Sequence, residues 1–131
     1  MTTTTKAPSV VDVAASEDVP ERGRLVVEIT TTRPVTVGIF RFAGRLYAWE
    51  NVCAHQGGPA CQGRIVSRVR ERLDPEQRSL GLTFDDGTMH VVCPWHGYEY
   101  DVTTGRHPGV PGASLRPFPV DEEEGRIRVT V

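Results

Sequence analysis

The stretch VTVGIFRFAGRLYAWE (35–50) constrains the fold most, because it has the pattern of two short strands joined by a tight turn. Val35, Val37 and Ile39 recur at every second position, which is the period of a strand with one buried face. The Ala43-Gly44 pair then separates this strand from a second one at 45–50. Further strand-like runs occur at 25–30, 82–84, 89–93, 98–102, 115–120 and 127–131. Thirteen glycines and ten prolines supply the turns, so the chain is predicted to be all-β, as a sandwich or a small barrel.

Two further hairpins are predicted, and one segment is left open. Asp86-Gly87 is a favoured two-residue turn that would join 82–84 to 89–93, and DEEEG (121–125) would join the last two strands. The segment 64–81 has apolar residues at helix-like spacing but is interrupted by Asp74-Pro75. It is either a strand extended by a loop or one short helix. Its arginines make it locally basic, so it is read as a solvated insertion, with a docking surface for an acidic partner as the alternative.

Length and composition predict one domain. Residues 1–9 form a threonine-rich tail that we expect to be disordered, and residues 10–131 form the folded domain. A net charge of −2 argues against a nucleic-acid or membrane-surface partner. No apolar run approaches the roughly 18 residues of a spanning helix, and no secretory signal is visible, so we expect a cytoplasmic protein. An odd number of cysteines, three, argues against a disulfide framework and favours metal-ligand or catalytic thiols.

Two short cysteine–histidine pairs each follow a predicted strand. Cys53 and His55 form a C-x-H pair, and Cys93 and His96 form a C-x-x-H pair, with glycines beside both. Tetrahedral zinc is one use of two thiolates and two imidazoles, although C-x-H is tighter than the usual spacing of two to four residues. A catalytic thiol with its base is another, but it leaves one pair unexplained. A [2Fe–2S] centre in which two histidines replace two cysteines on one iron uses both pairs.

The two boxes and their flanks resemble the Rieske family. They read CAHQGGP and CPWHGYEYD, with GRLYAWEN before the first box and DVTTGR after the second, and the likeness runs from about residue 10 to the end. The resemblance implies an antiparallel β-sandwich with two cluster-binding hairpin loops, at 53–63 and 93–98. It also implies one [2Fe–2S] cluster per chain, with Cys53 and Cys93 on one iron and His55 and His96 on the other. The distance between the boxes is longer than in typical small Rieske ferredoxins, and the insertion at about 64–81 supplies the excess.

Residues beside the predicted ligands indicate which branch of the Rieske family the chain resembles. In the respiratory-complex branch of the family a disulfide links the two loops, and the matching positions here are Gly58 and Trp95. That branch also has a serine that donates a hydrogen bond toward the cluster, and Tyr98 stands in its place. A tyrosine that can bond a ligand sulfur is kept as Tyr100. Fewer hydrogen bonds to sulfur destabilise the reduced cluster, so we expect a midpoint potential toward the low end of the roughly −150 to +300 mV Rieske range.

The remaining cysteine and histidines are assigned no role. Cys61 lies six residues after His55 and does not match the family's extra cysteine, so we read it as a small semi-buried residue. His90 and His107 are read as ordinary strand and loop residues.

The resemblance implies a one-electron carrier without catalytic activity. The chain is similar to the ferredoxin components that pass electrons from a flavin reductase to a ring-hydroxylating dioxygenase. One alternative is the small subunit of an assimilatory nitrite reductase, which can lack the ligands, so that the four retained here favour the ferredoxin. A zinc-stabilised binding module without a redox role is the alternative from another class. The chain is too short to contain an oxygenase's catalytic domain, and it has no G-x-G-x-x-G nucleotide fingerprint.

Overall fold

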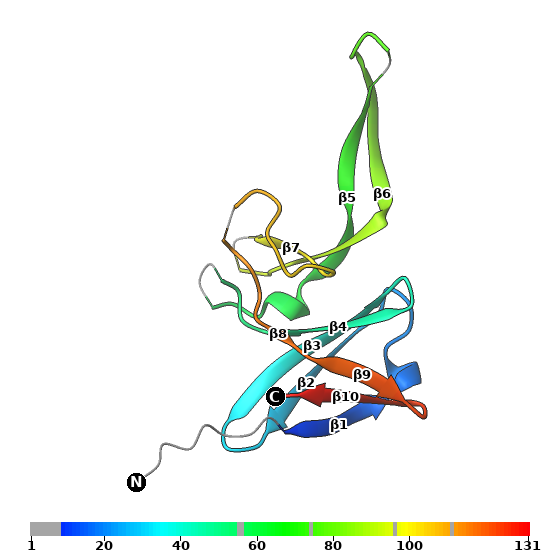
Figure 1. Ribbon diagram of the computed structural model, residues 1–131. Helices are drawn as coiled ribbons and strands as arrows, with labels where there is room; N and C mark the ends of the chain where they lie inside the picture. The colour runs from blue at the N-terminus through cyan, green and yellow to red at the C-terminus, as the bar shows by residue number, and fades with distance from the viewer. Residues whose placement is uncertain (1–8, 55–56, 74, 96, 111) are drawn as a thin grey trace. The chain divides into compact units, whose positions relative to one another are not determined.

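The chain divides into two compact units (Figure 1). The computed structural model describes residues 9–54, 57–73, 75–95, 97–110 and 112–131, and within 68–73 and 80–86 it describes the backbone alone. The sandwich unit comprises the chain up to Asn51 together with Arg116–Val131, and the loop unit comprises Val52–Leu115. Residues 1–8 of the predicted tail lie outside the described residues. Ser9 exchanges two backbone hydrogen bonds with Val131.

The sandwich unit contains two antiparallel sheets. One has the order β1-β10-β9 and the other the order β2-β3-β4-β8. The all-β prediction is confirmed, although the sequence pattern did not single out the first strand. The strands of this unit are β1 (Val10–Ala15), β2 (Arg24–Thr30), β3 (Pro34–Phe42), β4 (Arg45–Glu50), β8 (Pro117–Phe118), β9 (Val120–Glu123) and β10 (Arg126–Thr130), with a short 3-10 turn, η1 (Ser16–Asp18).

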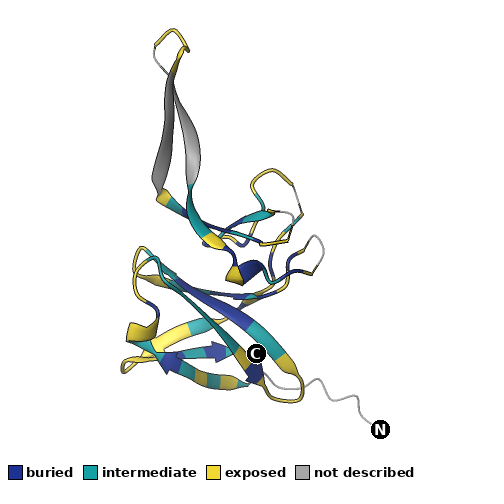
Figure 2. Ribbon diagram, turned by 180° about the vertical axis from the view of Figure 1, so that it is seen from behind, coloured by how far each residue is buried: buried dark blue, intermediate teal, exposed yellow. Residues whose placement is uncertain are grey.

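The core of the sandwich unit draws side chains from both sheets. Its buried members are Val19, Ile29, Val37, Ile39, Ala48, Phe118, Ile127 and Val129. Residues of β2, β3, β4 and β8 therefore share one apolar cluster with residues of β10, as expected for a sandwich. Buried residues are shown in dark blue in Figure 2. Glu28 and Thr30 of β2 are exposed on either side of buried Ile29, as in a strand with one buried face.

The turn between β3 and β4 lies where the sequence predicted it. Ala43 and Gly44 both have positive φ, 52° and 77°, as a two-residue hairpin turn with right-handed strand twist requires. The Glu21 carboxylate accepts hydrogen bonds from both turn amides, at 2.6 Å from Ala43 N and 2.9 Å from Gly44 N. These bonds hold the pKa of Glu21 below its ordinary value. The carboxylate therefore compensates two amides that the turn leaves without a strand partner.

The loop unit is built on a sheet of order β5-β6-β7, where β5 is Arg64–Leu73, β6 is Ser79–Val92 and β7 is Glu99–Asp101. Figure 1 shows β5 and β6 as a long two-stranded ribbon. The helix alternative for 64–81 is therefore wrong, and so is the turn predicted at Asp86-Gly87, which lies inside β6. The pairing jumps from Val66↔His90 to Arg68↔Asp85, so the Asp-Gly pair lies at a bulge-like irregularity. A long partner strand overrode the local turn preference.

No helix in the described part of the chain is long and apolar enough to cross a lipid bilayer.

Candidate metal centre

The two predicted ligand loops have the same backbone closure. In the first, Cys53 N–H donates to the carbonyl of Gly58 at 2.7 Å, and in the second, Cys93 N–H donates to the carbonyl of Tyr98 at 2.7 Å. Each hydrogen bond spans five residues. The fourth residue after each cysteine is a glycine with positive φ, Gly57 at 76° and Gly97 at 70°. Only glycine adopts this conformation at little cost, so the glycine in each box is explained by the turn that closes the loop.

The predicted histidine ligands, His55 and His96, lie outside the described residues. The described residues contain no group of three or more His, Cys, Asp or Glu side chains arranged to hold a metal ion. The structure therefore describes the cysteine half of the predicted ligand set.

The two cysteines of the predicted ligand set, Cys53 and Cys93, are buried and neighbour each other. Cys53 is 3% exposed and Cys93 is fully buried, and Cys53 lies near enough to Cys93 to influence its ionisation. Neither thiol forms a disulfide in the described structure. Burial raises the pKa of Cys93, and the Cys53 thiol beside it acts in the same direction, while a hydrogen bond from the Trp95 N–H opposes both. Because burial disfavours the charged form, such a pair ionises readily only with a cation beside it, which a bound metal would supply.

Tyr100 contacts the first of these sulfurs. Its side chain is fully buried, and its hydroxyl oxygen lies 3.1 Å from Cys53 Sγ and 2.9 Å from the backbone N of Ala54. Because the Ala54 N–H donates to the hydroxyl oxygen, the hydroxyl hydrogen remains available to donate to the sulfur. Burial, followed by the Cys53 contact, raises the pKa of Tyr100, so the hydroxyl keeps its proton. The structure brings Tyr100 to the sulfur of the predicted ligand Cys53, the contact that the family resemblance implied.

Trp95 and Gly58 connect the two loops without a covalent bond. A Cβ built on Gly58 would fall 2.7 Å from the Trp95 indole, so the ring lies directly against this glycine. These are the two positions at which the respiratory-complex branch carries its linking disulfide. Trp95 is nonetheless 51% exposed. A tryptophan packed on a glycine therefore occupies the place of a covalent link.

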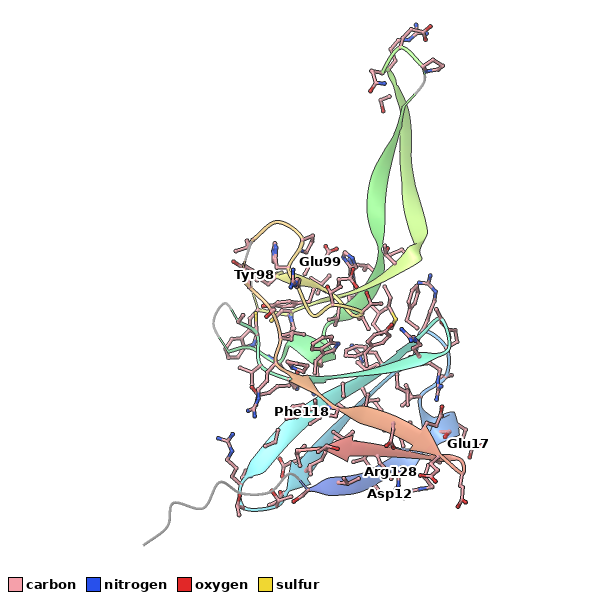
Figure 3. All side chains as sticks on the ribbon, in the orientation of Figure 1. Asp12, Glu17, Tyr98, Glu99, Phe118 and Arg128 are labelled. Carbon is pink, nitrogen blue, oxygen red and sulfur yellow. The ribbon has the colours of Figure 1, made fainter. Side chains whose placement is uncertain are left out.

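Tyr98 is half-buried and belongs to a small aromatic cluster. Its ring centroid lies 4.4 Å from that of His107 and 6.2 Å from that of Tyr100. Figure 3 labels Tyr98 and its neighbour Glu99. His107 is thus more than an ordinary loop residue, because it packs against Tyr98 and lies beside Tyr100, whose hydroxyl contacts Cys53 Sγ.

Gly63 is a site residue that the sequence reading missed. A Cβ at this position would fall 1.5 Å from the carbonyl oxygen of Val92, the residue before Cys93. The absence of a side chain lets the end of the first loop lie against the start of the second. The only sequence signal is a glycine between the 3-10 turn η2 (Ala60–Gln62) and β5, which is not specific. Cys61, in η2, is fully buried.

Comparison with known proteins decides which metal centre this geometry belongs to. A profile described as "Rieske [2Fe-2S] domain" matches residues 9–119. The chain belongs to the Rieske [2Fe–2S] domain family. The cofactor of this domain is a [2Fe–2S] cluster, and the domain is an electron carrier. The described donor set fits this cofactor, because the two buried thiols are adjacent and each has a hydrogen-bond donor, Tyr100 or the Trp95 amide.

Solved structures share the Rieske fold over most of this chain. A putative NADH-dependent nitrite reductase small subunit from Mycobacterium tuberculosis is 20% identical, with a TM-score of 0.66 over 96% of this chain and 97% of that one. The ferredoxin of carbazole 1,9a-dioxygenase from Nocardioides aromaticivorans IC177 is 20% identical, with a TM-score of 0.58 over 95% and 97%. A chain from a complex of reduced oxygenase and oxidized ferredoxin in carbazole 1,9a-dioxygenase is 21% identical, with a TM-score of 0.61 over 92% and 91%. No curated protein matches the sequence.

Proposed function

We propose that this Rieske domain is a one-electron shuttle whose cluster is held by Cys53 and Cys93 on one iron and by His55 and His96 on the other. The observation that carries the proposal is the pair of adjacent buried thiols, each at the start of a loop with the same closure. When bound, a [2Fe–2S] cluster takes up and releases one electron. The chain excludes water from the thiolate side, and the Tyr100 hydroxyl and Trp95 amide stabilise the added negative charge of the reduced state.

The proposed role is that of a cytoplasmic ferredoxin component, which receives electrons from a flavin reductase and passes them to a ring-hydroxylating oxygenase. Support comes from the likeness to the carbazole dioxygenase ferredoxin, which matches this chain almost end to end. Retention of all four predicted ligands in the sequence also supports a working carrier.

A second candidate is the small subunit of a nitrite reductase. The observation in its favour is the TM-score of 0.66 to the mycobacterial small subunit, over nearly the full length of both chains. In that role the chain would remain bound to a large catalytic subunit and would not diffuse between partners.

The cluster itself is tested by the purified protein. We expect a reddish-brown protein that bleaches with dithionite and contains about two irons and two acid-labile sulfides per chain. Cys93→Ser and His55→Cys are expected to abolish or rearrange the cluster. A colourless protein that contains one zinc ion would refute the proposal and favour the zinc-stabilised binding module.

The partner is tested by reconstitution. With a flavin reductase, NADH and a ring-hydroxylating oxygenase, the protein is expected to support hydroxylation that stops when it is omitted. A matched sample of the Cys93→Ser variant controls for direct transfer from reductase to oxygenase. Stable co-purification with a nitrite reductase large subunit, without any support of the oxygenase, would replace the ferredoxin role with the second candidate.

A further inference from the structure

His90 is a buried polar side chain that the proposed cluster site does not use. It lies on β6 and is 2% exposed. Its Nδ1 contacts the carboxylate of Glu99, and its Nε2 lies 3.7 Å from the carboxylate of Asp101. Burying an imidazole is unfavourable unless its ring nitrogens find polar partners, and both partners here come from β7. The sequence pattern gave His90 no role, because both carboxylates reach it only through strand pairing.

The two carboxylates lie on either side of Tyr100. The β6–β7 register pairs His90 with Asp101, Val91 with Tyr100 and Val92 with Glu99. Because side chains alternate along a strand, Glu99 and Asp101 lie on one face of the sheet with His90, and Tyr100 lies on the other. From that opposite face the Tyr100 hydroxyl reaches Cys53 Sγ at 3.1 Å.

Backbone hydrogen bonds flank β7, from Cys93 N–H to the Tyr98 carbonyl and from Val102 N–H to the Met89 carbonyl, and the His90 contacts add side-chain links between them. β7 contains three residues, and a one-residue slip would turn Tyr100 to the opposite face. Asp101 is held in turn, because its Oδ1 accepts from Thr103 N at 2.8 Å and from Thr103 Oγ1 at 2.7 Å. The contact to His90 therefore joins β6 to a carboxylate whose own orientation is fixed.

We propose that His90 is a positioning residue, which holds β7 through Glu99 and Asp101 so that Tyr100 keeps its hydrogen bond to Cys53 and thereby raises the midpoint potential of the cluster. This inference rests on the proposed function, because it requires a bound [2Fe–2S] cluster. It adds a residue outside the predicted ligand set, and it explains why a histidine is buried beside two acids.

The test is a double-mutant cycle on the holoprotein with His90→Phe, Tyr100→Phe and the double variant. Both single variants are expected to lower the midpoint potential, and the double variant is expected to fall no further than Tyr100→Phe alone. Additive shifts would mean that His90 acts without Tyr100. An unchanged potential in His90→Phe beside a lowered one in Tyr100→Phe would also overturn the proposal.

Two milder variants keep the test decisive if His90→Phe does not fold. Glu99→Gln, at a side chain that is 35% exposed, and Asp101→Asn are each expected to lower the potential, and neither is expected to do so in the Tyr100→Phe background. Glu76→Gln removes a carboxylate that pairs with exposed Arg78 between β5 and β6, and is expected to leave the potential unchanged. Wild-type potentials in both Glu99→Gln and Asp101→Asn would refute the proposal.

Hydrogen exchange provides a second readout that does not depend on electron transfer. The Ala54 N–H donates to the Tyr100 hydroxyl, so a displaced Tyr100 is expected to speed exchange at Ala54 in His90→Phe, as in Tyr100→Phe. Unchanged exchange at Ala54 in His90→Phe would contradict the positioning role. A protein that binds no [2Fe–2S] cluster would instead refute the proposed function, so the two failures are distinguishable.

Discussion

The hydrogen bond between Tyr100 and Cys53 provides the sharpest test of how this chain sets its redox potential. Tyr100→Phe keeps the buried ring and removes only the hydroxyl. That hydroxyl lies 3.1 Å from Cys53 Sγ and 2.9 Å from the Ala54 nitrogen. Because Tyr100 is fully buried, water is not expected to take the place of the hydroxyl beside the sulfur.

The size of the effect follows from the charge that the sulfur carries. A hydrogen bond to a charged group contributes about 1.5–3 kcal/mol, against about 0.5–1.5 kcal/mol for a neutral pair, so the reduced state gains roughly 1 kcal/mol more from the hydroxyl. In a one-electron couple about 59 mV corresponds to a tenfold change in the equilibrium constant, or about 1.4 kcal/mol. We therefore expect Tyr100→Phe to lower the midpoint potential by about 40 mV.

Tyr100→Phe also lowers the free energy of unfolding, through the loss of a second hydrogen bond. The Ala54 N–H loses its acceptor, but Ala54 is exposed, so water can compensate part of the loss. We expect the free energy of unfolding to fall by about 1 kcal/mol, at the low end for a group that loses its partner. The two effects are measured separately, by redox potential and by denaturant unfolding.

The assay is a spectroscopically monitored redox titration of the wild type and the variant. Tyr47→Phe in β4 is the matched control, because it makes the same chemical change in a strand of the sandwich unit. Its midpoint potential is expected to equal that of the wild type. A Tyr100→Phe potential that is unchanged or higher, with the cluster intact, would refute the reasoning.

Three further predictions concern the loops and the sandwich unit. Gly63→Ala places a Cβ 1.5 Å from the Val92 carbonyl oxygen, a backbone clash that no rotamer change can relieve. We therefore expect the free energy of unfolding to fall by about 3 kcal/mol or more and the iron content of the purified protein to decrease. Wild-type stability and iron content would contradict the close approach. Cys61→Ser is expected to leave the visible spectrum unchanged, and a bleached protein would show that Cys61 is a ligand. Arg41 lowers the pKa of Glu122 from 4.5 to about 2, so their pairing stabilises the fold fully above about pH 4.5 and is lost as the pH falls toward 2. Glu122→Gln is therefore expected to unfold more easily at pH 6 but to lose less stability between pH 4.5 and 2, and curves parallel to the wild type would show that the pair contributes nothing.

The strand pattern was predictable wherever local sequence and long-range pairing agreed. Val37 and Ile39 lie in the core and Ala43-Gly44 forms a two-residue turn, so the strand and the turn were both found, although β3 is buried continuously over 37–40 and not at alternate positions. Asp86-Gly87 has an equally favourable local signal, yet it lies inside β6. The difference is that β5 offers a long partner strand, and pairing with it outweighs a turn preference of a few residues.

The candidate site divides in the same way. Cys53 and Cys93 can be identified from residue type and spacing, and the glycine that closes each loop lies four residues after its cysteine. Both features are therefore visible in the local sequence. Gly63 and His90 have no such pattern. Their importance depends on Val92, Glu99 and Asp101, which reach them only through the pairing of separate strands.

Local sequence pattern was enough to predict the all-β class, the two cysteine–histidine boxes and, through them, the resemblance to the Rieske family. These features depend only on residues that are close together in the sequence, so they can be recognised without knowledge of the folded structure. Long-range strand pairing and loop closure were needed to show that the Cys53 sulfur meets the Tyr100 hydroxyl, that Trp95 packs on Gly58, and that His90 lies beside two carboxylates. Cys53 and Tyr100 are 47 residues apart, and only the register of β6 and β7 together with the closure of both loops brings their side chains into contact.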